Sequence, residues 1–124
     1  MANPNIVSVA SIYGKTVYDA DIATSASSIV SNAASSGKIF KINSLIIANI
    51  DGSNPADITV TLRNAAGGTT HSTLANTISV PADATLVVIS KDTSIYLEED
   101  MSLYLAASVA GDLSATCSYE EISE

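Results

Sequence analysis

The tripeptide Gly14-Lys15-Thr16 looks like the end of a phosphate-binding loop. Such a loop also needs a glycine five residues before Gly14, and that position is Val9. The backbone N–H groups that would cradle a phosphate are therefore missing. We interpret the tripeptide as a tight turn with an exposed lysine and predict no nucleotide cofactor.

The only histidine and the only cysteine lack the partners that catalysis requires. His71 precedes a serine, but there is no G-x-S-x-G motif to hold a nucleophile on a strained turn, so we expect an exposed strand histidine. Cys117 alternates in phase with Leu113, Ala115 and Tyr119, which predicts a core position. Zinc would need more cysteines or histidines. We therefore predict no catalytic residue and no enzyme activity.

Two groups of oxygen-bearing side chains could be considered for a metal ion. The first comprises Asp51, Ser53, Asn54 and Asp57, and the second is Glu98-Glu99-Asp100. A calcium loop of the EF-hand type needs a central glycine and a closing glutamate, and Pro55 interrupts the spacing. We interpret the first group as turn formers and the second as a solvated loop, and we predict no metal site.

The composition excludes several classes of protein. The chain has 124 residues, 47% of them hydrophobic and 15% charged, which is typical of one folded domain spanning 1–124. Its 13 acids and 5 bases give a net charge of −8, which argues against direct binding of nucleic acid or of an anionic membrane. One cysteine excludes an intrachain disulfide. No signal peptide or membrane-spanning stretch is recognisable, so we expect synthesis in a cytoplasm.

The elements that must position these residues are strands. Alternation with period two is clearest in Asp57–Arg63 and Leu113–Tyr119, and small or β-branched residues dominate. Turn formers recur about every ten residues, which predicts an all-β antiparallel sandwich, jelly-roll-like or Ig-like, of about 7–8 short strands. The other expected strands are Lys38–Ile50, Thr70–Leu74, Thr77–Val80, Ala84–Ile89, Ser94–Leu97 and Ser102–Ala107. Residues 19–37 are ambiguous, with a strand starting near Ile29-Val30.

Two segments are predicted to contact other subunits. The run Leu45-Ile46-Ile47 is apolar on both faces of its strand, which is typical of a sandwich interior or a subunit interface. Residues 1–9 are expected to form an arm that reaches a neighbour. The candidate interface residues are Asn3, Pro4, Ile6, Val7, Leu45 and Ile47.

The charges are distributed unevenly along the chain. All five bases lie between Lys15 and Lys91, and every ionisable residue after Lys91, tyrosines and the cysteine aside, is an acid. In a sandwich this distribution could place a negative rim at one end. Such a rim would either keep the protein soluble or match a basic patch on a partner.

Several stretches resemble small virion structural proteins of tailed bacteriophages, notably of marine and cyanobacterial phages. They are Ser36–Asn49, Ile78–Leu86, Ile95–Asp100, Ala106–Leu113 and the terminal Ser118–Ser123. The resemblance covers about residues 28–123. Asp100-Met101 stands where that group has a Gly-Asp corner, so a different turn geometry is expected there.

The resemblance implies a virion protein without enzyme activity. Its first expected role is capsid decoration (cement), in which a homo-oligomer such as a trimer binds the major capsid protein outside the head. The alternative is an adaptor of the neck, tail or fibre that binds other virion proteins. A third reading, from a different class, is a carbohydrate-binding module.

Overall fold

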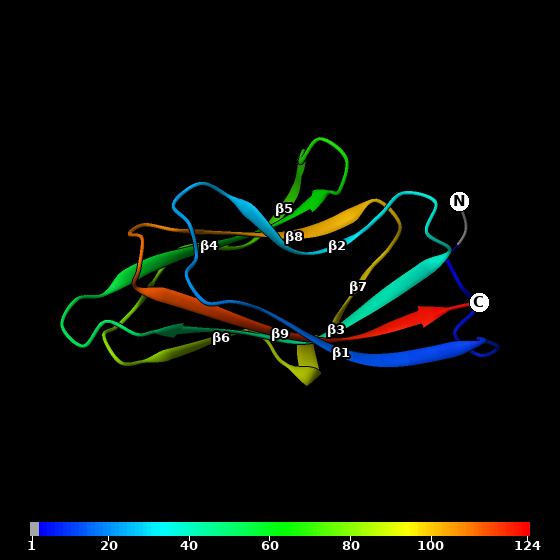
Figure 1. Cartoon of the computed structure of the whole chain (residues 1–124), viewed down its shortest axis with the longest axis horizontal. Helices are drawn as coiled ribbons and strands as arrows, with labels where there is room; N and C mark the ends of the chain where they lie inside the picture. The colour runs from blue at the N-terminus through cyan, green and yellow to red at the C-terminus, as the bar shows by residue number, and fades with distance from the viewer. Residues whose placement is uncertain (1–2) are drawn as a thin grey trace.

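The protein, described by a computed structural model over residues 3–124, consists of two antiparallel sheets stacked face to face (Figure 1). Sheet A has the order β1-β9-β3-β6, and β7 also pairs with β3; sheet B has the order β2-β8-β4-β5. The strands are β1 (Ser11–Asp19), β2 (Ser27–Asn32), β3 (Lys38–Asn49), β4 (Ala56–Asn64), β5 (Thr70–Val80), β6 (Thr85–Ile89), β7 (Ile95–Leu97), β8 (Met101–Ala107) and β9 (Leu113–Ser123). The predicted all-β antiparallel sandwich is confirmed.

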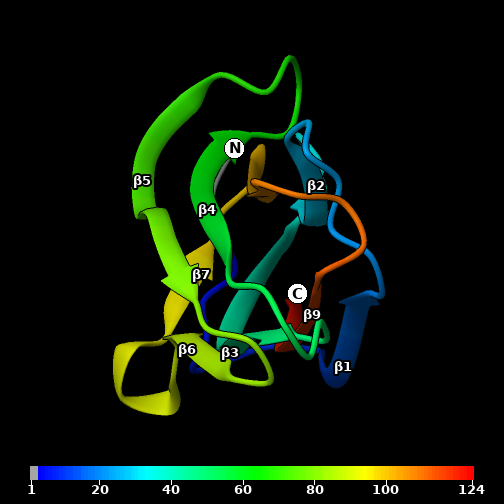
Figure 2. The same cartoon turned by 90° about the vertical axis from the view of Figure 1, so that its left-hand side faces the viewer.

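The strand order is that of a jelly roll. Successive strands alternate between the two sheets with two exceptions. Strands β4 and β5 form a hairpin within sheet B, and strands β6 and β7 both belong to sheet A. Because β6 and β7 are short and pair with different parts of β3, two strands occupy one position beside it. Both short strands were expected from the sequence, and the strand that was not expected is β1. Figure 2 shows the two layers end on, with β1 at one edge of the lower layer and β5 at the opposite edge of the upper layer.

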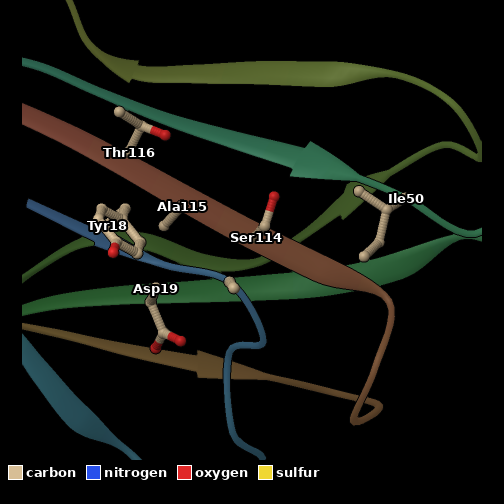
Figure 3. A pocket seen from close by; sticks show the side chains of 7 residues that line it. Tyr18, Asp19, Ile50, Ser114, Ala115 and Thr116 are labelled. Atoms are coloured by element: carbon tan, nitrogen blue, oxygen red, sulfur yellow. The ribbon is translucent and has the colours of Figure 1, made fainter.

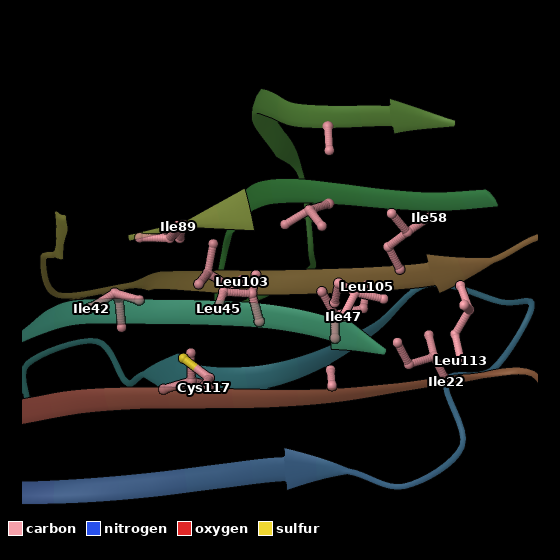
Figure 4. Packing of buried hydrophobic residues seen from close by; sticks show 14 of the residues in the cluster. Ile22, Ile42, Leu45, Ile47, Ile58, Ile89, Leu103, Leu105, Leu113 and Cys117 are labelled. Atoms are coloured by element: carbon pink, nitrogen blue, oxygen red, sulfur yellow. The ribbon is translucent and has the colours of Figure 1, made fainter. Parts of the chain in front are cut away.

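Alternating apolar side chains from both sheets fill the space between the layers (Figure 4). Leu45 and Ile47 of β3 meet Leu103 and Leu105 of β8 in this core, and all four are almost completely buried. Cys117 is fully buried among them, which confirms its predicted core position. Burial of each large aliphatic side chain contributes about 1.5–3 kcal/mol, so this core is the main source of stability.

Two buried asparagines connect the sheets at separate places. Asn32, at the end of β2, donates from Nδ2 to the carbonyl oxygens of Lys38 and Leu97, at 2.9 and 3.0 Å. Asn49, at the end of β3, donates from Nδ2 to the carbonyl oxygens of Asn54 and Val80, at 3.0 and 2.9 Å. Each side chain thus satisfies backbone acceptors where one layer passes to the other.

Strand β1 was not predicted, and the predicted turn at Gly14-Lys15-Thr16 is wrong. These residues lie in the middle of β1, which pairs with β9 over nine successive residue pairs. Lys15 Nζ lies 3.2 Å from Glu121 Oε2 on β9, and Lys38 approaches the same oxygen at 3.5 Å. Only Val17 of this strand packs against the core and none of its residues is fully buried, which is why its sequence pattern is weak.

Strand β5 is continuous where two short strands were predicted. It spans Thr70–Val80, and its pairing with β4 shifts register three times. At Thr77 the backbone φ is +47°, in the left-handed region, and its N–H donates to Thr59 Oγ1 at 3.1 Å. The local kink explains why the sequence pattern breaks between Leu74 and Thr77.

The turn at Asp100-Met101, for which a different geometry is predicted, depends on the conformation of Asp100. This residue adopts φ +62°, a conformation that glycine adopts most easily. Its Oδ1 accepts the N–H of Ala66 at 2.9 Å, and its carbonyl accepts the N–H of Ala65 at 3.0 Å. Asp100 therefore forms a left-handed turn and joins it to the β4–β5 connection.

Candidate functional site

The structure keeps the chemically reactive side chains apart. His71 is exposed on β5, as predicted, whereas Cys117 is buried in β9 on the other sheet. Burial raises the pKa of the Cys117 thiol from its ordinary value of 9.0 to about 12. A thiol in this environment stays protonated at neutral pH and is a poor nucleophile.

The acidic loop at Asp51 forms a turn, as predicted. Asp51 Oδ1 accepts the N–H groups of Ser53 and Asn54 at 2.8 and 3.4 Å. These hydrogen bonds, with one from the Asn54 side chain, hold the pKa of the Asp51 carboxyl below its usual value. Within residues 3–124, no three His, Cys, Asp or Glu side chains are grouped in a way that could hold a metal ion.

The predicted interface role of Leu45 and Ile47 is wrong. Both side chains are 0% exposed because they point between the two sheets of their own chain. Ile46, between them, points to the outer face of sheet A and is partly exposed. The run is apolar on both faces because one face forms the core and the other belongs to a surface.

The N-terminal segment is only partly the predicted arm. Asn3 Nδ2 donates to Glu98 Oε1 at 2.5 Å, Pro4 is buried, and the N–H of Ala10 pairs with the Ser123 carbonyl at 3.0 Å. Asn3 and Pro4 therefore lie against their own domain. Ile6 and Val7 are exposed, at 51% and 91%, and remain candidates for contact with a partner. The first two residues of the predicted arm lie outside the described residues.

Most of the acids after Lys91 lie at one end of the sandwich, because Asn32 bonds to Leu97, which precedes Glu98, and to Lys38, which pairs with Ser123. Asp112 lies apart from them, because it precedes β9 and Glu121 lies near the far end of that strand. Glu121 is buried at 8% exposure and is paired with Lys15 and Lys38. Glu120 accepts a hydrogen bond from Asn43 at 2.8 Å. Two of these acids therefore form contacts within the domain.

The outer face of sheet A carries a row of exposed side chains without charge. Tyr18, Thr116, Ile46 and Val87 stand opposite one another in register across β1, β9, β3 and β6. Tyr18 is 77% and Val87 56% exposed. Ile50, 60% exposed, follows the end of β3. These five residues are called the uncharged patch below.

A shallow depression of about 350 Å³ lies at one end of the uncharged patch. Figure 3 shows Tyr18, Thr116, Ser114 and Ile50 around it, contributed by β1, β9 and the end of β3. Asp19 at its margin is its only ionisable lining group besides the Tyr18 phenol. A wide, shallow surface of this kind suits contact with another protein better than enclosure of a small molecule.

The outer face of sheet B differs because its side chains cover one another. The Arg63 guanidinium lies 4.7 Å from the centre of the Tyr104 ring, and Arg63 Nε donates to Thr61 Oγ1 at 2.9 Å. Neighbouring positions on this face are Thr59 and Ala106, which are paired in register. On sheet B, Arg63 and Tyr104 therefore cover each other, whereas sheet A leaves Tyr18 and Val87 in solvent.

Sequence reasoning missed the uncharged patch because its members come from four strands. The patch depends on which strands are neighbours, and β1, which contributes Tyr18, was not expected to be a strand. One signal was present: Leu45-Ile46-Ile47 has more apolar residues than a single buried face requires. From this run we predicted an exposed apolar surface, but we assigned it to Leu45 and Ile47, whereas Ile46 is the residue on the outer face.

Comparisons with known proteins support the fold. No protein-family model matches the sequence, and no curated protein is significantly similar to it. A solved structure from work described as "Bacillus endospore appendages form a novel family of disulfide-linked pili" matches with a TM-score of 0.52 and 17% identity, over 90% of this chain and 88% of that chain. At this identity the match shows a shared fold. The resemblance to phage proteins stays a prediction.

The described part of the chain, residues 3–124, contains no helix long and apolar enough to cross a membrane. Its one helical element is the 3₁₀ turn Lys91–Thr93.

Proposed function

We propose that the protein is a non-enzymatic structural subunit of a tailed-phage virion that decorates the outside of the head. The observation that carries the proposal is the uncharged patch in a chain with a net charge of −8. The predicted resemblance of residues 28–123 to virion proteins suggests that the patch binds a phage particle. The adaptor role in the neck or tail remains the alternative within the same virion.

The uncharged patch has the chemistry of the centre of a protein interface. Such centres are depleted of charge and enriched in aromatic and aliphatic side chains. Tyr18 offers an apolar ring with a hydrogen-bonding hydroxyl, and Val87 and Ile50 gain free energy when they leave water. The acids elsewhere on the surface repel DNA and other acidic surfaces, which restricts docking to the uncharged face.

The fold supports this role by analogy. Jelly-roll sandwiches serve as building blocks of viral capsids as well as lectins and enzymes, so the analogy does not select a function by itself. A decoration protein needs a rigid domain with one face that fits a repeated lattice. Modest contacts then sum when several linked subunits engage the lattice together.

The structural similarity favours a second candidate, a subunit of a pilus-like filament. A disulfide link through this chain would need the thiol of Cys117, its only cysteine, to leave the core. Because that thiol is fully buried, a filament of this chain would be held together without disulfides. Electron microscopy of the purified protein distinguishes the candidates, since a filament subunit should form fibres without any particle.

The virion proposal is tested by counting copies of the protein in purified particles. Quantitative mass spectrometry should find hundreds of copies for a head decoration protein. A dozen or fewer copies would identify the adaptor instead. Absence of the protein from purified virions would contradict both roles.

The docking face is tested by a matched pair of variants. Val87→Asp adds a charge to the uncharged patch, and Thr73→Asp adds the same charge to an exposed residue of β5 in sheet B. We expect Val87→Asp to weaken binding to particles stripped of the protein by about tenfold or more. Thr73→Asp should bind as the wild type does. Equal binding by both variants would exclude the outer face of sheet A.

A further inference from the structure

The four edge positions of the sandwich differ in how well they are protected. The pairings of β2, β5 and β6 with their neighbours all contain register shifts. Strand β7, which shares an edge with β6, has three residues. Strand β1 pairs with β9 without any shift, over its full nine residues. Bulges and short strands discourage pairing with another chain, and β1 has neither device.

Strand β1 is also open to solvent. Ile12, Tyr13 and Tyr18 are 53%, 57% and 77% exposed, and the strand contains no proline. Within residues 3–124, β9 is the only strand that pairs with it. One row of its backbone N–H and C=O groups therefore faces away from the sheet and is available to another strand.

The charges on β1 decide which partner and which register fit. Lys15 and Asp19 are its only oppositely charged residues, and they lie on the same face because they are four residues apart. Lys15 also pairs with Glu121 of its own chain, so an Asp19 from a second copy would be a further partner of the same ammonium group. A second copy of β1, antiparallel and centred on residue 15, would place Lys15 against Lys15. If the pair is centred on Val17, Lys15 of each copy stands opposite Asp19 of the other.

We propose that β1 is a self-association edge: it pairs antiparallel with β1 of a second copy about a two-fold axis at Val17. The axis generates two identical Lys15–Asp19 contacts, as expected of a self-complementary interface. On the other face of the strand, Tyr18 stands opposite Thr16 of the second copy. Sheet A then runs without interruption through both copies.

This inference goes beyond the proposed function because it does not depend on the partner that the uncharged patch binds. Pairing of β1 continues the outer face of sheet A, so the uncharged patches of two copies lie on one surface. A dimer of this form presents two docking faces to a repeated lattice. Five opposed residue pairs make a small interface, so dimerisation should depend on concentration.

Charge exchange tests the pairing in the full chain by analytical ultracentrifugation over a range of concentrations. Lys15→Asp alone places acids opposite acids, and Asp19→Lys alone places lysines opposite lysines. Because Lys15→Asp also removes one of the two lysines paired with the buried Glu121, thermal unfolding first establishes that every variant is folded. Each single variant should dimerise about tenfold more weakly than the wild type. The double variant Lys15→Asp/Asp19→Lys should regain dimerisation because both contacts are restored with reversed polarity.

A mixture of the Lys15→Asp and Asp19→Lys variants gives the most specific test of the pairing. One variant then carries two acids and the other two lysines at these positions, so a mixed dimer should form where neither variant pairs alone. Recovery in the mixture or in the double variant also shows that Lys15→Asp has not unfolded the chain. A monomeric wild type at all concentrations would overturn the proposal, and so would an association that neither the double variant nor the mixture restores.

Discussion

Strands β1 and β5 are the two long edges of the sandwich, and they meet solvent in opposite ways. Strand β5 pairs with β4 through three register shifts and contains Thr77 in a left-handed conformation. Strand β1 pairs with β9 without interruption and exposes two tyrosines and an isoleucine. Irregular pairing twists an edge away from other chains, whereas a regular edge invites them. This difference is the basis of our proposal that copies of the protein associate through sheet A.

The outer faces of the two sheets show the same contrast. Sheet B places Arg63 over Tyr104 and bonds it to Thr61, so its largest side chains have partners within the chain. Sheet A leaves Tyr18 and Val87 exposed in a protein with 13 acids. Apolar surface that is kept exposed and uncharged in this way is typical of a docking face.

The comparison of β1 with β5 assumes that the stability of both edge strands depends on one core. Leu45→Ala tests this assumption, and it has the largest expected effect on the free energy of unfolding. Leu45 is 0% exposed, and its truncation should lower the free energy of unfolding by about 3 kcal/mol. Chemical denaturation measures the loss, and amide exchange should accelerate in β1 and β5 alike. A change below about 1 kcal/mol would contradict the role of Leu45 in a core shared by both edges.

The pH dependence of stability tests how firmly β1 covers the core, because Cys117 stands opposite Val17 of β1. The folded-state pKa of Cys117 is raised to about 12 from 9.0, so the folded chain binds more protons between these values. Stability should therefore be unaffected by this thiol below pH 9 and should fall by about 1.4 kcal/mol per pH unit above it. Denaturation at several pH values measures the slope.

Cys117→Ala is the control for that slope. The variant keeps the ionisation of the tyrosines, including Tyr119, whose pKa burial also raises. It should lose most of the extra dependence above pH 9. An unchanged slope would mean that the thiol is already accessible in the folded protein, and that β1 does not seal this part of the core.

The smallest effect is expected at the kink in β5. Threonine is β-branched and strained at φ +47°, so Thr77→Gly should raise the free energy of unfolding by about 0.5–1 kcal/mol. Thermal unfolding measures the gain, with Thr73→Gly as a control in the same strand, which should be destabilising. If Thr77→Gly is also destabilising, the kink is not a strained feature and the contrast with β1 loses one of its supports.

The sequence predicted the class of fold because most strands have one buried face. Asp57–Arg63 and Leu113–Tyr119 alternate cleanly for this reason, and Cys117 was placed correctly from its phase. Strand β1 escaped prediction because both of its faces are largely exposed, which removes the alternation. Strand β5 was divided in two because the kink at Thr77 interrupts its pattern.

The uncharged patch could not be predicted from the sequence because it is a tertiary property. Tyr18, Ile46 and Val87 become neighbours only when β1, β9, β3 and β6 adopt their order in sheet A. Leu45 and Ile47 were assigned to an interface because a run apolar on both faces cannot reveal which face is the core. Asn3 and Pro4 were assigned to an arm, and their contacts with the domain depend on the position of Glu98.

The central claim is that the outer face of sheet A contacts the particle and the outer face of sheet B does not. Hydroxyl-radical footprinting tests it directly, by comparing virions with the free protein at the same concentration. Tyr18 and Ile50, both well exposed in the free chain, should lose most of their reactivity on the particle, and Tyr104 of sheet B should react equally in both states. Loss of reactivity at Tyr104 with Tyr18 and Ile50 unchanged would contradict the account.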